Sequence, residues 1–559
     1  MTTDARSPST LAWLGVAEGA ALIRARELSP VDWTQALLAR IEGTGQPIDA
    51  FIHVAADSAL ARARAAEDQL AAGHDLGPLH GVPCAIKDII ATADMPTTAH
   101  SRVLIGHQPA ADATIVRRLR QAGAVLLGKT ATHEFAHGGP STDLPWPPAR
   151  NPWNLAHFSG GSSSGSGAAL AGGLAPAALG TDTGGSIRIP AGLCGVTGLK
   201  PTYGRVSRSG IYALSPALDT AGPMARSARD CALLLQAIAG HDPADPASAR
   251  VPVADFAAAL VGHLKDIRIG VPRHFFESDL RAHPEAAAAL AHALEVLGSL
   301  GARIEAVTLA PMMDFGDVRV LIQEAEAFAI YHSLLREDAG RFGQDFLGRV
   351  LPGCLVPAFA QSQAHRKRRM LVGQMAGVLQ TVDALVTVGS GPAPRFDARE
   401  THGFLYGLWS DKPNLLAPFS VTGFPTLSVC NGFAASGLPT SMQIAGRAWD
   451  DATVLRIGDA FQQVTDWHQR HPADPVSPGP VSLAPPEPAE ALDATTIAWA
   501  DACIAHADLR LTEAQRSLVL QAAPRVKRMI ARLGSVDDRS IEPAAVFRLD
   551  QPGIDFRPG

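Results

Sequence analysis

Two glycine–serine clusters in the stretch 159–206 constrain this chain more than any other feature of its sequence. The first is Gly160-Gly161-Ser162-Ser163 and the second is Gly184-Gly185-Ser186, with a run of small residues between them that can form one helix. Glycines this dense allow tight turns and close backbone approach, at a cost in chain entropy. Acyl transfer to a hydroxyl needs a nucleophile beside uncovered backbone N–H groups. Residues 181–186 offer both, so the stretch predicts an acyl-transfer site.

The stretch closely resembles the signature of the amidase signature hydrolases, GGSS(S)GS…GTDxGGSIRxPAxxCGxxGLKPT, which it matches almost throughout. In that family the catalytic groups are a nucleophilic serine, a second serine behind a cis peptide bond and an upstream lysine. The resemblance implies that Ser186 is the nucleophile and Ser162 the second serine, since they stand 24 residues apart, as in the family pattern. It implies that the lysine is Lys87, within the GxPxxxKD-like element GVPCAIKD.

The resemblance also implies an oxyanion hole made by the main-chain N–H groups of Thr183, Gly184, Gly185 and Ser186. No metal or organic cofactor is implied. Asp182 and Arg188 are expected either to pair and hold this loop or to form an ordinary surface ion pair.

The environment of Lys87 supports a base. The segment 81–90 is apolar on both sides of the lysine and is expected to enter a buried strand. Burial disfavours the charged form, so the pKa of a buried lysine falls and the amine can accept a proton. The alternative is a surface ion pair with Asp88.

The expected fold class is α/β: an amidase signature fold with a mixed central sheet covered by helices, over residues 1–471. A strand–helix–strand pattern at 267–307 is consistent with it. Residues 314–380 are expected to be largely helical, and in this family the corresponding region shapes the substrate pocket. A proline-rich linker follows at 472–488, with seven prolines in seventeen residues.

The C-terminal residues 489–559 are expected to form a small helical extension. Helices are predicted at 489–507 and 512–533, the second opening with a capping box at Thr512 and Gln515, kinked or split at Pro524 and closing on Gly534. An extended segment is expected at 541–547. The extension resembles the GatC-type and AtzG-type accessory proteins of amidase complexes. The alternative is an unrelated helical cap over an apolar flank or a dimer seam.

Two motifs compete with this interpretation. The segment from His133 to His137 reads HEFAH and matches the H-E-x-x-H zinc motif, but the glycines that follow it break the helix that zinc ligation needs. Residues 161–165 match the G-x-S-x-G nucleophile elbow, but a loop is expected in front of them instead of a strand. We therefore expect neither a zinc site nor an α/β-hydrolase elbow.

Composition narrows the possible partners. A net charge of −6 over 559 residues argues against a nucleic-acid surface, and no apolar run is long enough for a membrane span. Six cysteines without metal-type spacing and no apolar leader in residues 1–10 are typical of a cytoplasmic protein. We expect a small-molecule amide-type substrate and a homodimer.

The sequence thus predicts an amidase that cleaves a carbon–nitrogen bond through an acyl-enzyme. The natural bond type stays open among amide, carbamate (including carboxybiuret-type), imide and ester. One alternative is the glutamine-hydrolysing component of an amidotransferase, although no Asp/Arg pair that would hold the amino-acid end of glutamine is evident. Another is an inactive scaffold, which the intact Lys87, Ser162 and Ser186 argue against.

Overall fold

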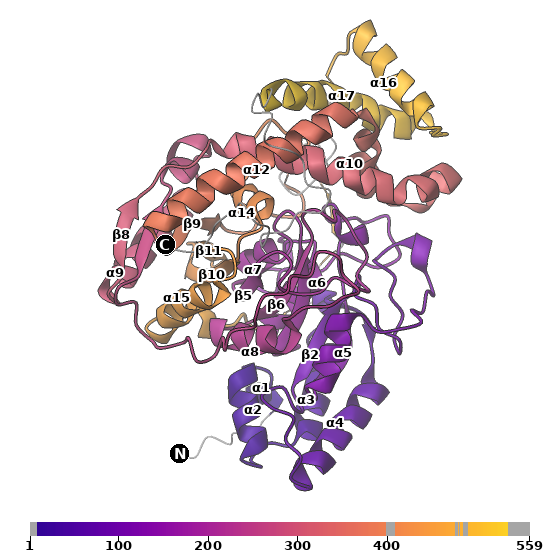
Figure 1. Ribbon diagram of the computed structural model, residues 1–559. Coiled ribbons are helices and arrows are strands. Elements are labelled where there is room, and N and C mark those ends of the chain that lie inside the picture. Colours follow the sequence, from indigo (N-terminus) through magenta and orange to yellow (C-terminus); the bar gives the residue numbers. More distant parts are fainter. Residues whose placement is uncertain (1–7, 399–407, 476–478, 480, 484–489, 535–559) are drawn as a thin grey trace.

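The computed structural model describes residues 8–398, 408–475, 479, 481–483 and 490–534. Within these residues the strands form one 11-stranded mixed sheet in the order β1-β3-β2-β4-β6-β5-β10-β11-β9-β7-β8 (Figure 1). The strands are β1 (Phe51–Val54), β2 (Pro83–Lys87), β3 (Val125–Thr130), β4 (Ala177–Asp182), β5 (Thr197–Lys200), β6 (Thr220–Ala225), β7 (Arg268–Val271), β8 (Arg303–Ala306), β9 (Ala384–Ser390), β10 (Thr426–Phe433) and β11 (Pro439–Gly446).

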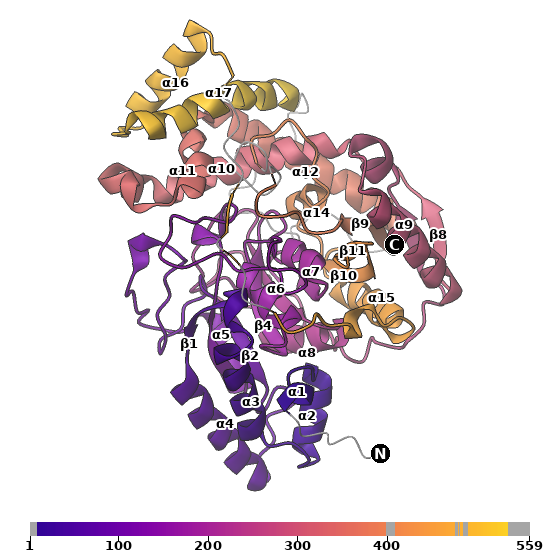
Figure 2. The same ribbon diagram turned by 180° about the vertical axis from the view of Figure 1, so that it is seen from behind.

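Helices surround this sheet, so the expected α/β fold is confirmed (Figures 1 and 2). Those before β7 are α1 (Pro8–Leu11), α2 (Val16–Arg24), α3 (Pro30–Glu42), α4 (Ala56–Ala71), α5 (Thr114–Gln121), α6 (Ser164–Ala171), α7 (Arg188–Cys194) and α8 (Ala228–Ile238). Those after it are α9 (Pro284–Ser299), α10 (Met312–Asp338), α11 (Gln344–Val350), α12 (Ala358–Thr381), α14 (Ala417–Thr422), α15 (Asp451–Gln463), α16 (Ala494–His506) and α17 (Glu513–Leu533). Short 3-10 turns include η3 (Glu134–Ala136) and η6 (Leu351–Leu355).

The strands β2, β3 and β4 run parallel to one another at the centre of the N-terminal half of the sheet. Every residue of the three is buried. Strands covered on both faces read as near-continuous apolar runs, which is why the sequence around Lys87 shows no polar alternation. The lysine therefore ends a strand in the interior, as expected.

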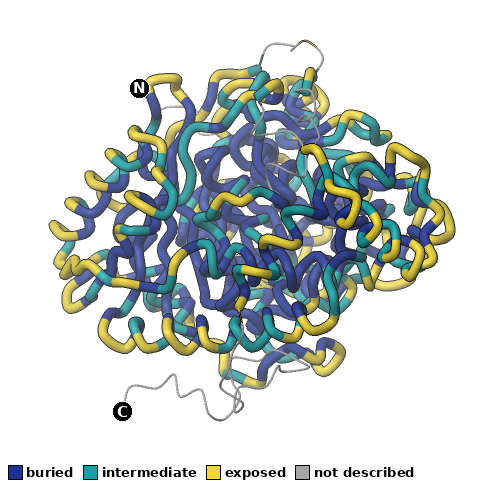
Figure 3. Tube along the Cα trace, turned by 90° about the horizontal axis from the view of Figure 1, so that it is seen from above, coloured by how far each residue is buried: buried dark blue, intermediate teal, exposed yellow. Residues whose placement is uncertain are grey.

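Helices α7 and α15 cover opposite faces of the sheet. A Cβ on Gly198 of β5 would lie 2.8 Å from Ala191 of α7, and Gly198 pairs across the sheet with Ser428. The next residue, Leu427, faces the other way and comes within 2.4 Å of where a Cβ on Gly458 of α15 would be. The dark interior of Figure 3 is this double-sided core.

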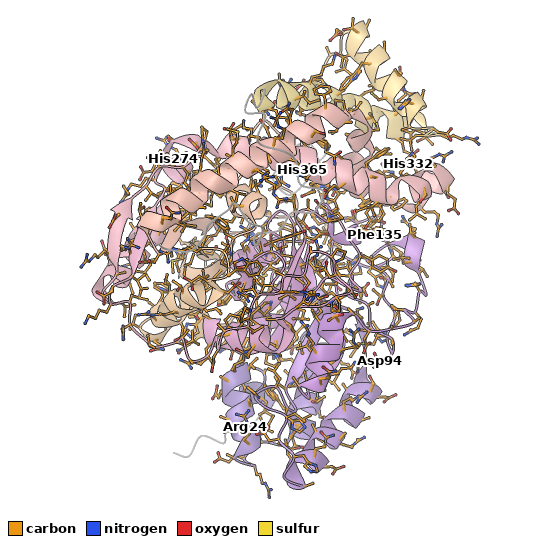
Figure 4. All side chains as sticks on the ribbon, viewed as in Figure 1. Arg24, Asp94, Phe135, His274, His332 and His365 are labelled. Carbon is orange, nitrogen blue, oxygen red and sulfur yellow. The ribbon has the colours of Figure 1, made fainter. Side chains whose placement is uncertain are left out.

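The extension packs on the same chain. Figures 1 and 2 show α16 and α17 lying over α10 and α12 at one end of the molecule. Arg532 of α17 forms an ion pair with Asp317 of α10 at 2.7 Å, and Figure 4 labels His332, whose Nε2 lies 2.7 Å from the carbonyl oxygen of Ala507. The apolar side chains that α17 buries are Val519, Ala522, Ala523, Val526, Met529 and Leu533.

The predicted ends of the extension's second helix are confirmed, and one of its predicted features is wrong. Thr512 and Gln515 form the capping box and Gly534 follows the last turn. The expected split at Pro524 does not occur, because α17 runs unbroken from Glu513 to Leu533 through this proline. Tertiary packing on α10 and η6 supports the helix where the proline removes one backbone hydrogen bond. Most of the predicted linker and the segment 541–547 lie outside the described residues.

Candidate active site

Lys87 stands at the C-terminal end of β2 with a fully buried side chain. Its Nζ lies 2.7 Å from Oγ of Ser162 and 2.8 Å from Oγ1 of Thr181 at the end of β4. Burial lowers the pKa of Lys87 to about 7, although the carboxylates of Asp182 and Asp219 act in the opposite direction. The lysine is therefore available as a neutral amine near neutral pH.

The alternative pairing of Lys87 with Asp88 at the surface does not occur. Asp88 is buried as well, and its carboxylate lies 3.5 Å from Nζ of Lys129 and accepts hydrogen bonds from Thr98. Neighbouring residues of an extended segment point to opposite sides, so the two side chains separate.

The first cluster forms the turn that leads into α6. The peptide bond between Gly161 and Ser162 is cis. A Cβ on Gly161 would lie 2.0 Å from Cε1 of His133, so only glycine fits against that ring. The N–H of the next residue, Ser163, donates to the carbonyl oxygen of Ser186 at 3.2 Å. The two serine clusters are thus in direct contact.

The second cluster is the turn between β4 and α7, and its Ser186 is half-buried. Within the described residues no hydrogen bond reaches the Oγ of Ser186. A half-exposed hydroxyl next to a buried serine–lysine pair is accessible to a substrate carbonyl, which is the arrangement that serine acylation needs.

Asp182 and Arg188 hold this turn from below. Nε and Nη2 of Arg188 donate to the two carboxylate oxygens of Asp182 at 2.9 and 3.0 Å, and both side chains are fully buried. Burial alone raises the pKa of Asp182, but the guanidinium outweighs it and keeps that pKa below its usual value. The pair is the buried clamp of the two alternatives, and Arg188 extends it to Gln443 and Ser420.

The four N–H groups expected at the oxyanion hole are not equivalent. The N–H of Gly185 donates to Oδ1 of Asp182 at 2.8 Å. The N–H groups of Thr183, Gly184 and Ser186 have no such acceptor among the described residues. In this conformation Gly185 shapes the turn, and the other three N–H groups are free to meet a substrate oxygen.

The HEFAH segment does not present two histidines on one helical face. It forms the short turn η3, with Phe135 at a φ of 47°. Nδ1 of His133 lies 2.5 Å from the carbonyl oxygen of Gly138, whereas Nε2 of His137 lies 2.9 Å from the carboxylate of Glu324. The described residues contain no group of three or more histidine, cysteine or acidic side chains that could hold a metal.

Three residues of the site are not evident from the sequence. Thr181, the second partner of Lys87, lies inside the recognised motif, but the motif gives it no role. Asp219 is buried and accepts a hydrogen bond from the Thr183 hydroxyl at 2.6 Å. Arg319 reaches the site from α10, and no local motif surrounds it in the sequence. A cavity of about 210 Å³ borders Thr181, Thr183 and Asp219.

Comparisons with known proteins agree with this geometry. A family model described as Amidase matches residues 32–455. The chain is 42% identical over 477 residues to a component of the glutamyl-tRNA(Gln) amidotransferase of Roseiflexus sp. (strain RS-1), its A chain. The match covers 80% of this chain and 96% of the relative.

Solved structures share the fold at lower identity. A chain from a vestigial protein complex, described as revealing the evolutionary origins of an s-triazine catabolic enzyme, is 32% identical with a TM-score of 0.75. The match covers 80% of this chain and 98% of that one. The native peptide amidase of Stenotrophomonas maltophilia is 32% identical with a TM-score of 0.70, covering 83% and 98%. The matched family region ends before α16 begins.

Proposed function

This chain belongs to the amidase signature family, whose members here are hydrolases of carbon–nitrogen bonds, and we propose that it cleaves a small amide-type substrate through Ser186, Ser162 and Lys87. The observation that carries the proposal is the 2.7 Å contact between Nζ of Lys87 and Oγ of Ser162 in a fully buried setting. A lysine that served only for its charge would gain nothing from a place that disfavours the charge.

In the proposed reaction, Oγ of Ser186 attacks the carbonyl carbon and gives its proton to Ser162, which passes its own to neutral Lys87. The substrate oxygen becomes an oxyanion, which the free N–H groups of Thr183, Gly184 and Ser186 stabilise. Each such donor is worth roughly 3–4 kcal/mol in other acyl-transfer enzymes. The relayed proton returns to the leaving nitrogen as the carbon–nitrogen bond breaks. Water then attacks the acyl-enzyme, releasing the acid and restoring Ser186.

Labelling with a fluorophosphonate probe, followed by peptide mass spectrometry, tests the proposal. We expect one adduct, on Ser186, and we expect ammonia or amine release from at least one member of a panel of primary amides, anilides, carbamates and esters. The Ser186→Ala variant is the matched control and should neither label nor turn over. An adduct confined to another serine would contradict the assignment.

A second candidate is a glutaminase that supplies ammonia to a partner enzyme. It is favoured by the relatives, which include components of glutamyl-tRNA(Gln) amidotransferases. The fused extension suits a self-sufficient amidase better, since α17 already covers part of α10. Glutaminase activity measured beside simple amides separates the two. Glutamine as the sole substrate, with activity that rises when a partner enzyme is added, would favour the second.

A further inference from the structure

Arg319 of α10 lies against the serine loop, although it is far from that loop in sequence. A Cβ on Gly184 would lie 3.0 Å from its Nη1, so the guanidinium sits directly beside the turn that carries Ser186. The side chain is buried, with only 5% of the residue's surface exposed. Figure 1 shows α10 crossing over the region of α6 and α7 from above.

The hydrogen-bonding capacity of Arg319 is largely unused. In the described part of the chain, its one hydrogen bond runs from Nη1 to Oε1 of Gln323 at 3.1 Å. Its Nε is buried without any partner, and no carboxylate there comes within ion-pair distance. A guanidinium carries five N–H donors in a planar fork. Most of this fork is therefore open toward the loop.

Other buried arginines around the site are neutralised. Arg188 has a two-point contact with Asp182, and Arg349 lies 2.7 Å from Asp345. The nearest acid on α10, Glu324, does not reach Arg319, because its carboxylate accepts from Gln323 at 2.7 Å and contacts His137.

An unpaired buried charge is costly, so a fold that pairs its neighbours and leaves this one open calls for a partner. Burial lowers the pKa of Arg319 to about 10, which leaves it protonated at neutral pH.

We propose that Arg319 binds an anionic group of the substrate, and that the preferred substrates are short amides which carry a carboxylate. This inference rests on the proposed function. A guanidinium fork matches a carboxylate in two-point contact. Because Gly184 stands only two residues before Ser186, the carboxylate must lie within a short spacer of the reacting carbonyl. The inference covers both positions of the charge, on the acyl part or on the leaving group.

Two isosteric pairs test the preference. Succinamate and 4-methylpentanamide differ by a carboxylate on the acyl side, and N-acetylglycinate and N-isobutylacetamide differ by one on the leaving-group side. We expect kcat/KM to favour the anionic member of one pair by about 10- to 100-fold, the range of a charged hydrogen bond. Arg319→Met should abolish that ratio, and Arg319→Lys should keep part of it. The pair that shows the effect identifies the position of the charge.

Arg336→Met is the matched control, because it removes a half-exposed arginine from the same helix. It should leave the ratio unchanged, and thermal melts establish that each variant folds. If Arg319→Met slows both members of a pair equally, the residue is structural and the inference is wrong. If the unmodified protein shows no anionic preference in either pair, the inference is also wrong.

Calorimetry on the Ser186→Ala background separates this inference from the proposed function. The anionic amides should bind there, and adding Arg319→Met should weaken the binding by about 10-fold or more. Absence of both turnover and Ser186 labelling in the unmodified protein would defeat the proposed function alone. Binding that does not depend on Arg319 would defeat the inference even if the protein is an active amidase.

Discussion

Nζ of Lys87 lies 2.7 Å from Oγ of Ser162, although 75 positions separate the two residues along the chain. The lysine ends one buried strand, the serine opens the turn before α6, and the packing of that turn against His133 brings them together. The second partner of Nζ is the hydroxyl of Thr181, at 2.8 Å. Two neutral hydroxyl partners and no direct carboxylate favour the neutral amine, which is the form that a base requires.

Ser186→Ala should abolish turnover, whereas Ser162→Ala should leave a weak remnant. Ser186 forms the covalent bond in the proposed mechanism, and Ser162 only relays a proton, a step typically worth about 10²–10⁴-fold. Mass spectrometry of a trapped acyl-enzyme checks the difference. A Ser162 adduct in the unmodified protein would reverse the two roles.

The pH dependence of kcat/KM should report Lys87. Its pKa is lowered to about 7, and the deprotonated form is the base, so kcat/KM should be low below pH 7 and rise to a plateau above it. Lys87→Arg should be almost inactive despite keeping the charge, because guanidinium does not release its proton in this range. Substantial activity in that variant would mean that the site needs a positive charge and not a base.

Chelators should not affect activity. His133 and His137 turn to different partners, a carbonyl oxygen and the carboxylate of Glu324, so they do not converge on a common point. Incubation with EDTA or phenanthroline before assay, together with metal analysis, tests this. Stoichiometric zinc whose removal stops turnover would contradict it.

Asp182→Ala should destabilise the protein by about 3–5 kcal/mol, because it leaves the buried guanidinium of Arg188 without its counter-charge. It should also lower activity, since the carboxylate anchors the N–H of Gly185 and hence the turn of Ser186. Asp75→Ala, which breaks a half-exposed pair with Arg24, is the control and should change stability little. Equal melting temperatures in the two variants would refute the clamp.

Truncation after His471 should leave the catalytic groups intact but lower the melting temperature by several degrees, because it uncovers the surface of α10 under α17. Ala523→Asp places a charge at a fully buried position of α17, and Ala531→Asp places the same charge at an exposed one. Only the first should reproduce the loss.

Light scattering on the same proteins tests the expected homodimer. If the truncated chain matches the full chain in melting temperature, oligomeric state and kcat/KM, the extension is dispensable. The resemblance of the extension to GatC-type proteins stays a prediction.

The sequence by itself determined the family, the fold class and the residues proposed for catalysis. Glycines and serines at fixed spacing specify local backbone turns, and an unbroken apolar run around Lys87 specifies a buried strand; both are encoded within short segments. The capping box of α17 could be predicted for the same reason, since its two residues stand three positions apart.

The tertiary structure alone decided which distant groups meet. Arg188 reaches Gln443 across 255 positions, Arg319 arrives at Gly184 from a helix without a motif, and Glu324 draws His137 away from His133. Such contacts depend on how whole elements pack and leave no mark on local spacing. The unbroken helix through Pro524 has the same origin, because the packing of α17 on its own chain outweighs a local preference to break.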